Sequence, residues 1–436
     1  MNITPDKKVG IFTTFGNWDD AYSPCNVVKN QLLALLRHGY SPTLFVLDVF
    51  PESSANALIS IFDQYKEKVE LRRVIPAVAF EPYHGIAQHR NVPNSIEKDV
   101  AKITPVLEDQ FKDFDVILCH DIIFQDSFLP YNASLHKMIM PKKLQFFHWM
   151  HSGPSIRPSD LTPPVSYLYT LPPQSKLVYM NNYDIVRAAE MYGVFPKDVR
   201  IVHNPIDYTS FKWIHPVVSR LFDAYRINEA DIVAVYPLST TRMGAGGKQL
   251  NKAIKIMGFL KQLGKNVRYI IPNAHANGDN EKIAIAEMLL LGKSYGLNEE
   301  DIIFTSFLGK EYEGGIPHDA VMQLFQYSDL FLFPSVSENA PLILLEAALT
   351  KNLLVLNEDF TPMKDFVGPH ALYFKFDSVT TVTNHPRGED VYFNDVAKII
   401  NSHLESNTEY KSKREVRQKF NLDYIFKNQM EPLFFE

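Results

Sequence analysis

The sequence predicts an α/β protein made of two doubly wound domains, and three observations carry this prediction. Short apolar runs rich in β-forming residues alternate with helical patterns along most of the chain, as in βαβ units with parallel sheets. Many of these runs are apolar on both faces, which suits a sheet covered by helices on both sides. The chain has 436 residues, which is too long for one ordinary core.

The first series of strands ends near residue 203. Its expected strands lie, in order, at 8–15, 43–50, 116–120, 144–151, 177–180 and 199–203. Between the first two strands, apolar residues recur at helical spacing from Pro24 to His38, so a helix is expected there.

The periodicity lapses over residues 203–216, and we place the link between the two domains there. The second series has expected strands at 231–239, 267–274, 301–309, 329–335, 353–357 and 371–376. A helix is expected to end at Lys261, and the segments 390–405 and 410–434 have helical patterns. Ligands bind at the carboxyl ends of such strands, and two facing domains would place a cleft between them.

Composition excludes several classes of protein. With 46% hydrophobic and 22% charged residues, the chain is typical of a globular protein rather than a disordered one. The formal net charge of −6 provides no overall basic footprint for nucleic acid. Cys25 and Cys119 are the two cysteines, so a reducing compartment is expected. No apolar run suits a signal peptide or a membrane span, and we therefore expect a cytoplasmic protein.

The stretch SVSENAPLILLEAAL, residues 335–349, follows an expected buried strand and opens a helix. Asn339 is the expected N-cap and Pro341 the first helical residue. A helix N-terminus offers free N–H groups and partial positive charge, which suit a phosphate or sugar hydroxyls. Glu346 lies in an apolar run, where a carboxylate needs a partner. The alternative interpretation makes Glu338 a charge that complements the helix dipole and Glu346 a solvated helix residue.

The segment TTRMGAGGKQ, residues 240–249, lies between a strand and a helix. Its glycines would let the backbone approach an anion, and Arg242 and Lys248 could neutralise a phosphate. The segment is not a P-loop and does not fit the G-x-G-x-x-G spacing. The alternative is a flexible surface turn with two solvated cations.

Three further places at strand ends are candidates for a cleft edge. His151 follows the strand in FFHWMHSGPS (146–155), whereas His148 lies inside it and is expected to be a packed, hydrogen-bonded side chain. Gly16 lies in the turn after the first strand. The run CHD, residues 119–121, ends another strand and is a weaker candidate. The two histidines alone do not make a metal site.

Together these segments resemble the retaining glycosyltransferases of the GT-B fold, in the large sucrose-synthase-like and mannosyltransferase-like family. FLFPSVSENAPLILLEAAL (331–349) is similar to the family's strand, Pro-Ser, Glu, seven residues, Glu signature. VRIVHNPIDYTSF (199–211) resembles its linker pattern, and FTSFLGK (304–310) its F-x-G strand. LSTTRMGAGGKQ (238–249) occupies the place of its Arg…Lys phosphate-binding pair.

The resemblance implies a fold and its boundaries. Two Rossmann-like domains would face each other across a cleft. Residues 1–205 would form an acceptor-binding domain and residues 206–409 a domain that binds the nucleotide sugar. Residues 410–436 would form a C-terminal helix that crosses back onto the first domain.

The resemblance also implies a role for each candidate site residue. In this family's pattern Glu346 would accept hydrogen bonds from the ribose hydroxyls, while Glu338 and His151 would lie near the transferred sugar. The N–H groups of Leu342 and Ile343 would meet the diphosphate or the sugar, and Gly16 would lie near the phosphates. Arg242 and Lys248 would stabilise the leaving diphosphate, with no metal required. Asn339, Ala340 and Pro341 stand where relatives have Gly-Phe-Gly, so sugar preference is expected to depend on them.

The implied function is transfer of a sugar, with retention of anomeric configuration, from a UDP- or GDP-sugar to a saccharide or another small hydroxylated acceptor. Three alternatives stay open. A viral type of DNA glycosyltransferase would modify a hydroxylated base and would need a basic groove, for which the cations at 72–73, 89–90 and 142–143 are candidates. A non-catalytic protein that binds nucleotide sugars and a nucleotide-sugar epimerase are the other two.

Overall fold

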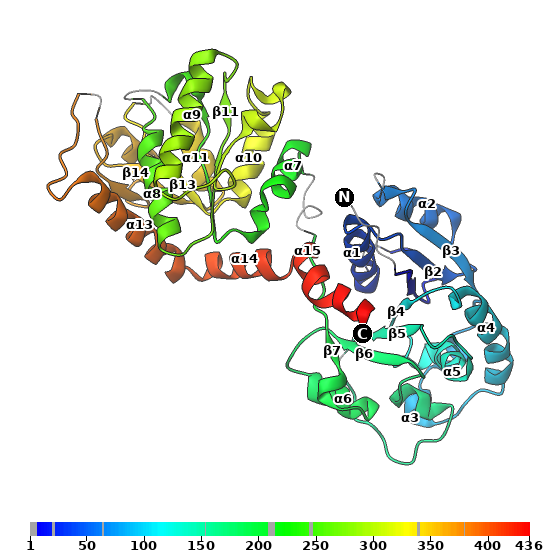
Figure 1. Ribbon diagram of the computed structural model, residues 1–436. Coiled ribbons are helices and arrows are strands. Elements are labelled where there is room, and N and C mark those ends of the chain that lie inside the picture. The colour runs from blue at the N-terminus through cyan, green and yellow to red at the C-terminus, as the bar shows by residue number, and fades with distance from the viewer. Residues whose placement is uncertain are drawn as a thin grey trace. The chain divides into compact units, whose positions relative to one another are not determined.

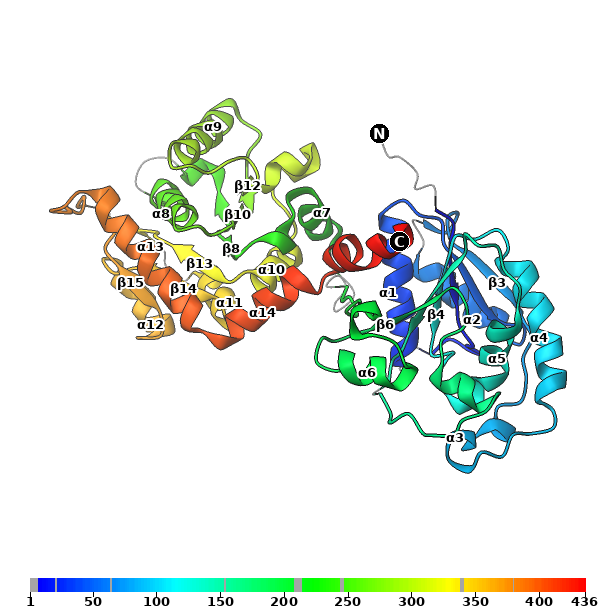
Figure 2. The same cartoon turned by 60° about the horizontal axis from the view of Figure 1, so that its bottom comes forward.

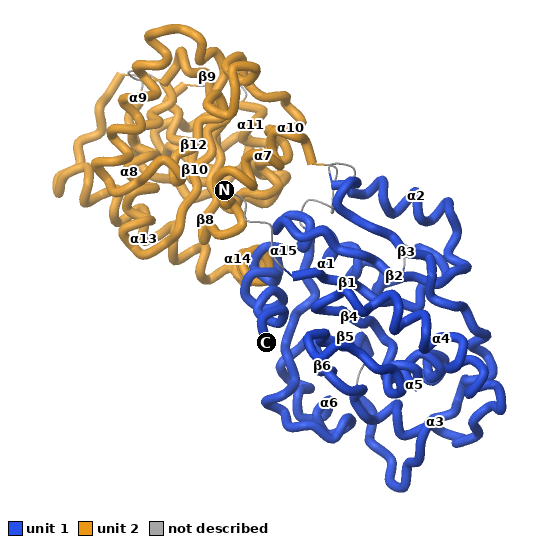
Figure 3. Tube along the Cα trace, turned by 45° about the vertical axis from the view of Figure 1, so that its right-hand side comes forward, with its two compact units in different colours: residues 1–207, 420–436 blue, residues 208–419 orange. Residues whose placement is uncertain are grey.

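The protein consists of two compact units, each with its own parallel sheet. The computed structural model describes residues 7–19, 22–62, 65–152, 154–207, 214–243, 247–337, 341–378 and 380–436. Unit 1 comprises residues 1–207 and 420–436, and unit 2 comprises residues 208–419 (Figure 3). The predicted α/β class with two doubly wound parallel sheets is therefore confirmed.

Unit 1 contains a seven-stranded parallel sheet with the strand order β3-β2-β1-β4-β5-β6-β7 (Figure 1). Its strands are β1 Val9–Phe12, β2 Thr43–Leu47, β3 Glu70–Ile75, β4 Val116–His120, β5 Gln145–Trp149, β6 Ser175–Tyr179 and β7 Arg200–Ile201. Its helices are α1 Ser23–Arg37, α2 Glu52–Ile61, α3 Ile86–His89, α4 Ile96–Phe111, α5 Leu129–Lys137, α6 Ile185–Tyr192 and α15 Leu422–Ile425.

Alternate residues of the central strands of unit 1 face two different cores. Ile11 and Leu118 join a core with α1, α2 and the C-terminal segment. Phe12 and Ile117 join a second core with α4 and α5 on the opposite face. This two-sided burial explains why the central strands read as continuous apolar runs in the sequence.

Unit 2 contains a six-stranded parallel sheet with the strand order β12-β10-β8-β13-β14-β15 (Figure 2). Its strands are β8 Ile232–Val235, β10 Val267–Ile271, β12 Ile302–Phe304, β13 Leu330–Phe333, β14 Leu353–Asn357 and β15 Leu372–Phe374. A short pair, β9 Leu238–Ser239 and β11 Asn273–Ala274, extends beyond it. Its helices are α7 Pro216–Tyr225, α8 Leu250–Gln262, α9 Asp279–Ser294, α10 His318–Tyr327, α11 Leu342–Leu349, α12 Lys364–Val367, α13 Glu389–Ser406 and α14 Thr408–Lys419.

The C-terminal segment 420–436 belongs to unit 1, whereas α14 belongs to unit 2. Phe426 and Phe434 pack on Tyr40 with ring centroids 5.7 and 5.6 Å away. The His38 ring stacks on Phe426 at 4.3 Å, and its Nε2 lies 3.0 Å from Asp423 Oδ1. The segment that returns to unit 1 thus begins at Phe420, later than the residue 410 expected from the sequence.

The sequence analysis did not predict strand β3, which lies at the edge of the first sheet. This strand reads ELRRVI and is only partly buried, so it lacks the apolar run that marks the other strands. Charged side chains are common on edge strands, where they discourage pairing with other chains. The pair at 72–73, interpreted from the sequence as scattered cations, is therefore part of a strand.

Candidate functional site

The strand order of unit 2 reverses between β8 and β13, which are neighbours in the sheet. Such a switch point leaves a crevice at the carboxyl ends of the two strands, and ligands of doubly wound folds bind there. The segment after β8 carries Arg242 and Lys248, and the segment after β13 leads to α11 and Glu346. The two regions singled out from the sequence therefore flank the same switch point.

Direct contacts hold the segment after β8 against the segment after β13. Arg242 is exposed, and its Nη2 donates to the carbonyl of Ser337 at 3.3 Å. The carbonyl of Gly247 accepts from the N–H of Val336 at 3.3 Å and from the hydroxyl of Ser335 at 3.4 Å. A Cβ at Gly247 would lie only 3.2 Å from the carbonyl oxygen of Arg242, so this close approach favours glycine.

Lys248 is buried, with 5% of its surface exposed. Its Nζ lies 5.4 Å from the ring centroid of Phe333, the last residue of β13. The lysine side chain is thus fixed beside the carboxyl end of the strand rather than solvated. This burial contradicts the alternative interpretation of Lys248 as a solvated surface cation.

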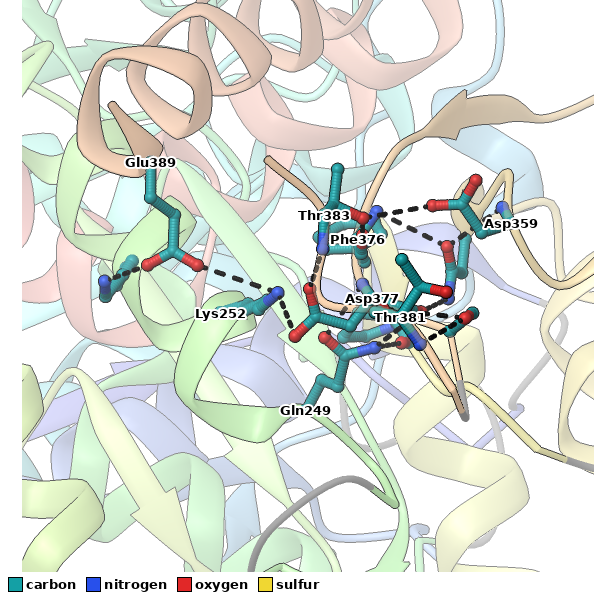
Figure 4. A network of polar contacts seen from close by, with 12 residues as sticks. Gln249, Lys252, Asp359, Phe376, Asp377, Thr381, Thr383 and Glu389 are labelled. Atoms are coloured by element: carbon teal, nitrogen blue, oxygen red, sulfur yellow. Dashed lines mark hydrogen bonds and ion pairs between the residues drawn. The ribbon is translucent and has the colours of Figure 1, made fainter. Parts of the chain in front are cut away.

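A network of hydrogen bonds and ion pairs holds the segments after β8 and β13 in place (Figure 4). Gln249 donates from Nε2 to the carbonyls of Pro334 and Asp377 at 3.0 and 3.2 Å, and its Oε1 accepts the N–H of Asp377 at 3.2 Å. Lys252, 4% exposed, forms an ion pair with Asp377 at 2.6 Å. Asn357, the last residue of β14, donates to the carbonyl of Ser335 at 3.3 Å. These bonds fix the backbone that leads into α11.

Glu346 has one carboxylate oxygen with a hydrogen-bond partner and one without a partner among the described residues. The sequence indicated that this carboxylate needs a partner, and Oε1 lies 2.8 Å from His318 Nε2, at the start of α10. Oε2 is buried and has no hydrogen-bond partner among the residues that the structure describes. A buried carboxylate oxygen without a donor is costly, and the hydroxyl of a ligand would satisfy it.

The helix that carries Glu346 starts one residue later than expected. Pro341 has an extended backbone (φ −74°, ψ 95°) and precedes the first helical residue, Leu342, so it is the N-cap and not the first helical position. The first N–H groups of α11, on Leu342 and Ile343, have no carbonyl to bond within the helix. Glu338, Asn339 and Ala340, three of the predicted site residues, lie outside the described residues.

Unit 1 has a switch point of its own, between β1 and β4. Gly16 lies in the exposed segment after β1, as predicted. A Cβ at this position would approach only Leu47 Cδ1, at 3.9 Å. Packing within unit 1 therefore does not require glycine there, and the residue leaves open space at the strand end.

His151 belongs to a group of polar side chains at the ends of β4 and β5. Its Nε2 lies 2.8 Å from Nδ1 of His120, and its backbone N–H donates to Asp121 Oδ1 at 3.1 Å. Burial lowers the pKa of His151 to about 4 and that of His120 well below its usual range. Both imidazoles are therefore neutral near pH 7.

Asp121 is 5% exposed and has a left-handed backbone with φ 59°, which is uncommon for a residue other than glycine. Burial raises the pKa of its carboxyl to about 6, while the N–H of His151 and Gln125 counteract part of this rise. The strain and the desolvation at one residue mark a place where stability has been given up, as is common at functional sites.

His148, by contrast, is a packed residue of β5, as predicted. It is 1% exposed, and its Nε2 lies 3.0 Å from the hydroxyl of Ser175. Burial lowers its pKa to about 3. It takes no part in the group around His151.

Asp121→Asn is expected to stabilise the protein by about 1–3 kcal/mol at pH 7.5. The folded-state pKa is raised, so this carboxyl favours folding below about pH 4 and loses that contribution as the pH rises through about 6. The advantage of the variant should fall by about half at pH 5. Urea unfolding followed by tryptophan fluorescence measures the free energy of unfolding at pH 5 and pH 7.5. The exposed Asp113→Asn is the control and should be as stable as the wild type at both pH values. An advantage that is the same at pH 5 and 7.5 would contradict the assignment.

Two features are absent from the described ranges. Across them, no group of three or more His, Cys, Asp or Glu side chains is arranged to hold a metal ion. Each helix within the same ranges is too short or too polar to cross a lipid bilayer.

Comparison with known proteins adds distant likenesses. No family model matches the chain, and no curated protein matches it. Among solved structures, HepE from Anabaena in complex with UDP is similar, with 14% identity, coverage of 98% of this chain and 99% of that chain, and a TM-score of 0.32. A glycosyltransferase from Rickettsia africae has 11% identity, coverage of 99% and 98%, and a TM-score of 0.35. The trehalose-6-phosphate synthase OtsA has 14% identity, coverage of 98% and 97%, and a TM-score of 0.35. At such TM-scores the likeness is no argument for the activity of this chain.

The sequence missed the partners of the predicted residues. His318 lies 2.8 Å from Glu346, and the hydroxyl of Tyr236 donates to the carbonyl of Lys248, but neither residue belongs to a recognisable motif. His120 and Asp121 were considered weaker candidates, although they contact His151 directly. Their signal was a pair of polar residues that ends an apolar strand, and only the strand order places that strand beside β1.

Proposed function

We propose that the protein is a glycosyltransferase that moves a sugar from a UDP- or GDP-sugar to a hydroxyl of a saccharide or another small acceptor. The contact of Arg242 with the carbonyl of Ser337 carries this proposal, since it brings the cationic segment of unit 2 to the strand end that leads into α11. Cations, helix N–H groups and a carboxylate at one switch point suit a ligand with phosphates and a ribose.

Each group has a proposed role. Oε2 of Glu346, buried without a donor, accepts a ribose hydroxyl, while His318 keeps Oε1 in place. Arg242 and Lys248 stabilise the diphosphate, whose charge grows as the glycosidic bond breaks, and the N–H groups of Leu342 and Ile343 contribute to the same stabilisation. These groups can carry the charge of the leaving group without a metal ion.

We propose that transfer retains the anomeric configuration. The leaving diphosphate takes the proton of the acceptor hydroxyl on the same face of the sugar. Glu338, Asn339, Ala340 and Pro341 are proposed as contacts of the transferred sugar. His151, in unit 1, is proposed to bind a sugar hydroxyl. Gly16 is proposed to leave space for the phosphates. The anomeric configuration of the product, read from proton coupling constants in NMR, tests retention.

No observation favours transfer to DNA. Three of the six residues considered for a basic groove pair with acids: Arg72 with Glu70 at 2.9 Å, Arg73 with Glu52, and Lys143 with Asp115 at 3.5 Å. Such pairs reduce the positive potential that a nucleic-acid backbone requires. Small hydroxylated acceptors therefore remain the proposal.

The deciding experiment is a thermal-shift panel of UDP- and GDP-sugars on the full chain. A true donor raises the unfolding temperature by mass action. Glu346→Gln is expected to weaken binding of that donor about 10- to 100-fold, because a hydrogen bond to a charged group contributes about 1.5–3 kcal/mol. Glu287→Gln, an exposed position on α9, is the matched control and should bind like the wild type. If no nucleotide sugar stabilises the protein, or if Glu346→Gln binds with unchanged affinity, the proposed site is wrong.

A further inference from the structure

Three side chains of unit 1 form a hydrogen-bonded row that leads from the interior to His151. Gln31, on α1, and His120, the last residue of β4, are each 1% exposed. Oε1 of Gln31 lies 2.9 Å from His120 Nε2, and His120 Nδ1 lies 2.8 Å from His151 Nε2. The two imidazole rings are nearly parallel, with an interplanar angle of 18°.

The row restricts where protons can be. A neutral imidazole has one N–H donor and one lone-pair acceptor, and two ring nitrogens at 2.8 Å share a single proton. Because burial keeps both rings neutral, the row has only two consistent arrangements. In the first arrangement, His120 donates to Gln31 and accepts from His151. In the second, Gln31 donates to His120, and His120 donates to His151. The Gln31 amide is assigned with its oxygen, which can only accept, toward His120 and with its NH₂ buried without a partner among the described residues.

We propose that Gln31 and His120 are positioning residues that hold His151 as the tautomer protonated on Nε2, so that its Nδ1 presents a lone pair to the ligand. The ring then accepts a hydrogen bond from a hydroxyl and repels an anionic oxygen. Asp121 Oδ1 accepts the backbone N–H of His151 at 3.1 Å and so holds the backbone that carries this ring. This part of unit 1 thus selects a neutral, hydroxylated group over a phosphate or a carboxylate.

The meaning of this arrangement for catalysis rests on the proposed function, in which His151 binds a sugar hydroxyl. The proton arrangement itself does not, because it follows from groups within unit 1. The experiment therefore reads the protons directly and reads activity separately.

The experiment is histidine-selective ¹⁵N labelling of the full chain, with the tautomer read from long-range ¹H–¹⁵N correlations. His151→Gln identifies the signals of His151 by their loss. The wild type is expected to show His151 protonated on Nε2 and unprotonated on Nδ1 near pH 7.5. A proton on Nδ1 instead would overturn the proposal, because it corresponds to the reversed row with the Gln31 NH₂ facing His120.

Two variants test the role of Gln31. Gln31→Met removes the acceptor while keeping a similar length, and a mixture of both His151 tautomers is expected. Gln31→Glu has acceptors and no donor once its carboxyl is ionised, so at a pH above the pKa of that carboxyl the wild-type tautomer should persist. Gln88→Met, an exposed position on α3, is the control and should leave the His151 signals unchanged. If Gln31→Met folds and keeps the pure wild-type tautomer, Gln31 does not position His151. If Gln31→Met does not fold, the His151 tautomer in the wild type and in Gln31→Glu still tests the proposal.

Two probes separate this inference from the proposed function. UDP-glucose, if bound, is expected to shift the Nδ1 signal of His151 without protonating it, and inorganic phosphate should leave it unchanged. Protonation of both nitrogens by phosphate would overturn the inference. If no nucleotide sugar binds while His151 keeps its Nε2 proton, the proposed function fails and the proton arrangement stands.

Discussion

Lys248→Met is expected to lower kcat about 10²- to 10³-fold, as the loss of one group that stabilises developing charge does in other enzymes. Methionine keeps most of the length and apolar contact of the lysine stem, including its packing beside Phe333, and removes the ammonium group. Since the proposed charge on the diphosphate is greatest in the transition state, the KM for the donor should change less than kcat. Steady-state kinetics with the donor found by the thermal-shift panel measure both constants.

The control for this variant is Lys282→Met, an exposed lysine on α9, which should keep wild-type kinetics. The melting temperature of Lys248→Met must be compared as well, because its site is buried. A well-folded variant with unchanged kcat, or with a raised KM alone, would show that Lys248 binds the ground state or nothing at all.

Arg417→Met is expected to lower the free energy of unfolding of unit 2 by about 3 kcal/mol, the lower end of the cost of breaking a buried ion pair, because Lys413 Nζ remains 3.3 Å from Asp329 Oδ1. Arg417 Nη1 lies 3.0 Å from Asp329 Oδ2, and the two side chains are 2% and 1% exposed. Nη2 donates to the carbonyl of Ala230 at 2.8 Å. The pair thereby ties α14 to the residues that precede β8 and β13. Urea unfolding of the full chain measures the loss.

The buried pair can be separated from general packing by a double-mutant cycle. Asp329→Asn combined with Arg417→Met removes both charges, so the double variant should be less destabilised than the sum of the two single changes. Arg387→Met is the matched surface control, because its partner Asp395 and Arg387 itself are 38% and 75% exposed. Its effect should stay within about 0.5 kcal/mol. Equal effects at residues 417 and 387 would refute the argument.

The sequence predicted the parts of the fold whose burial is two-sided. The bounds of β4 and β14, residues 116–120 and 353–357, were predicted to the residue because each strand is an apolar run that ends in one polar residue. β3 was missed because an edge strand is free to carry charges. The local pattern of apolar residues therefore predicts buried strands well and edge strands poorly.

The candidate site was predictable only where one stretch of chain carries the signal. The apolar run around Glu346 indicated that its carboxylate needs a partner, but His318 is 28 residues away and has no periodic signal of its own. Likewise His120 gains its meaning from Gln31, 89 residues earlier. Such pairings depend on strand order and helix packing, which spacing along the chain does not encode.

The return of residues 420–436 to unit 1 has a consequence for the order in which the protein is made. Leu422, Phe426 and Phe434 are members of the same core as Val9 and Leu44. A ribosome delivers them only after all of unit 2 has been synthesised, although domains generally fold as units when their residues emerge. Unit 1 therefore cannot complete its core until residues 420–436 have been synthesised. All residues of unit 2 are available before that point.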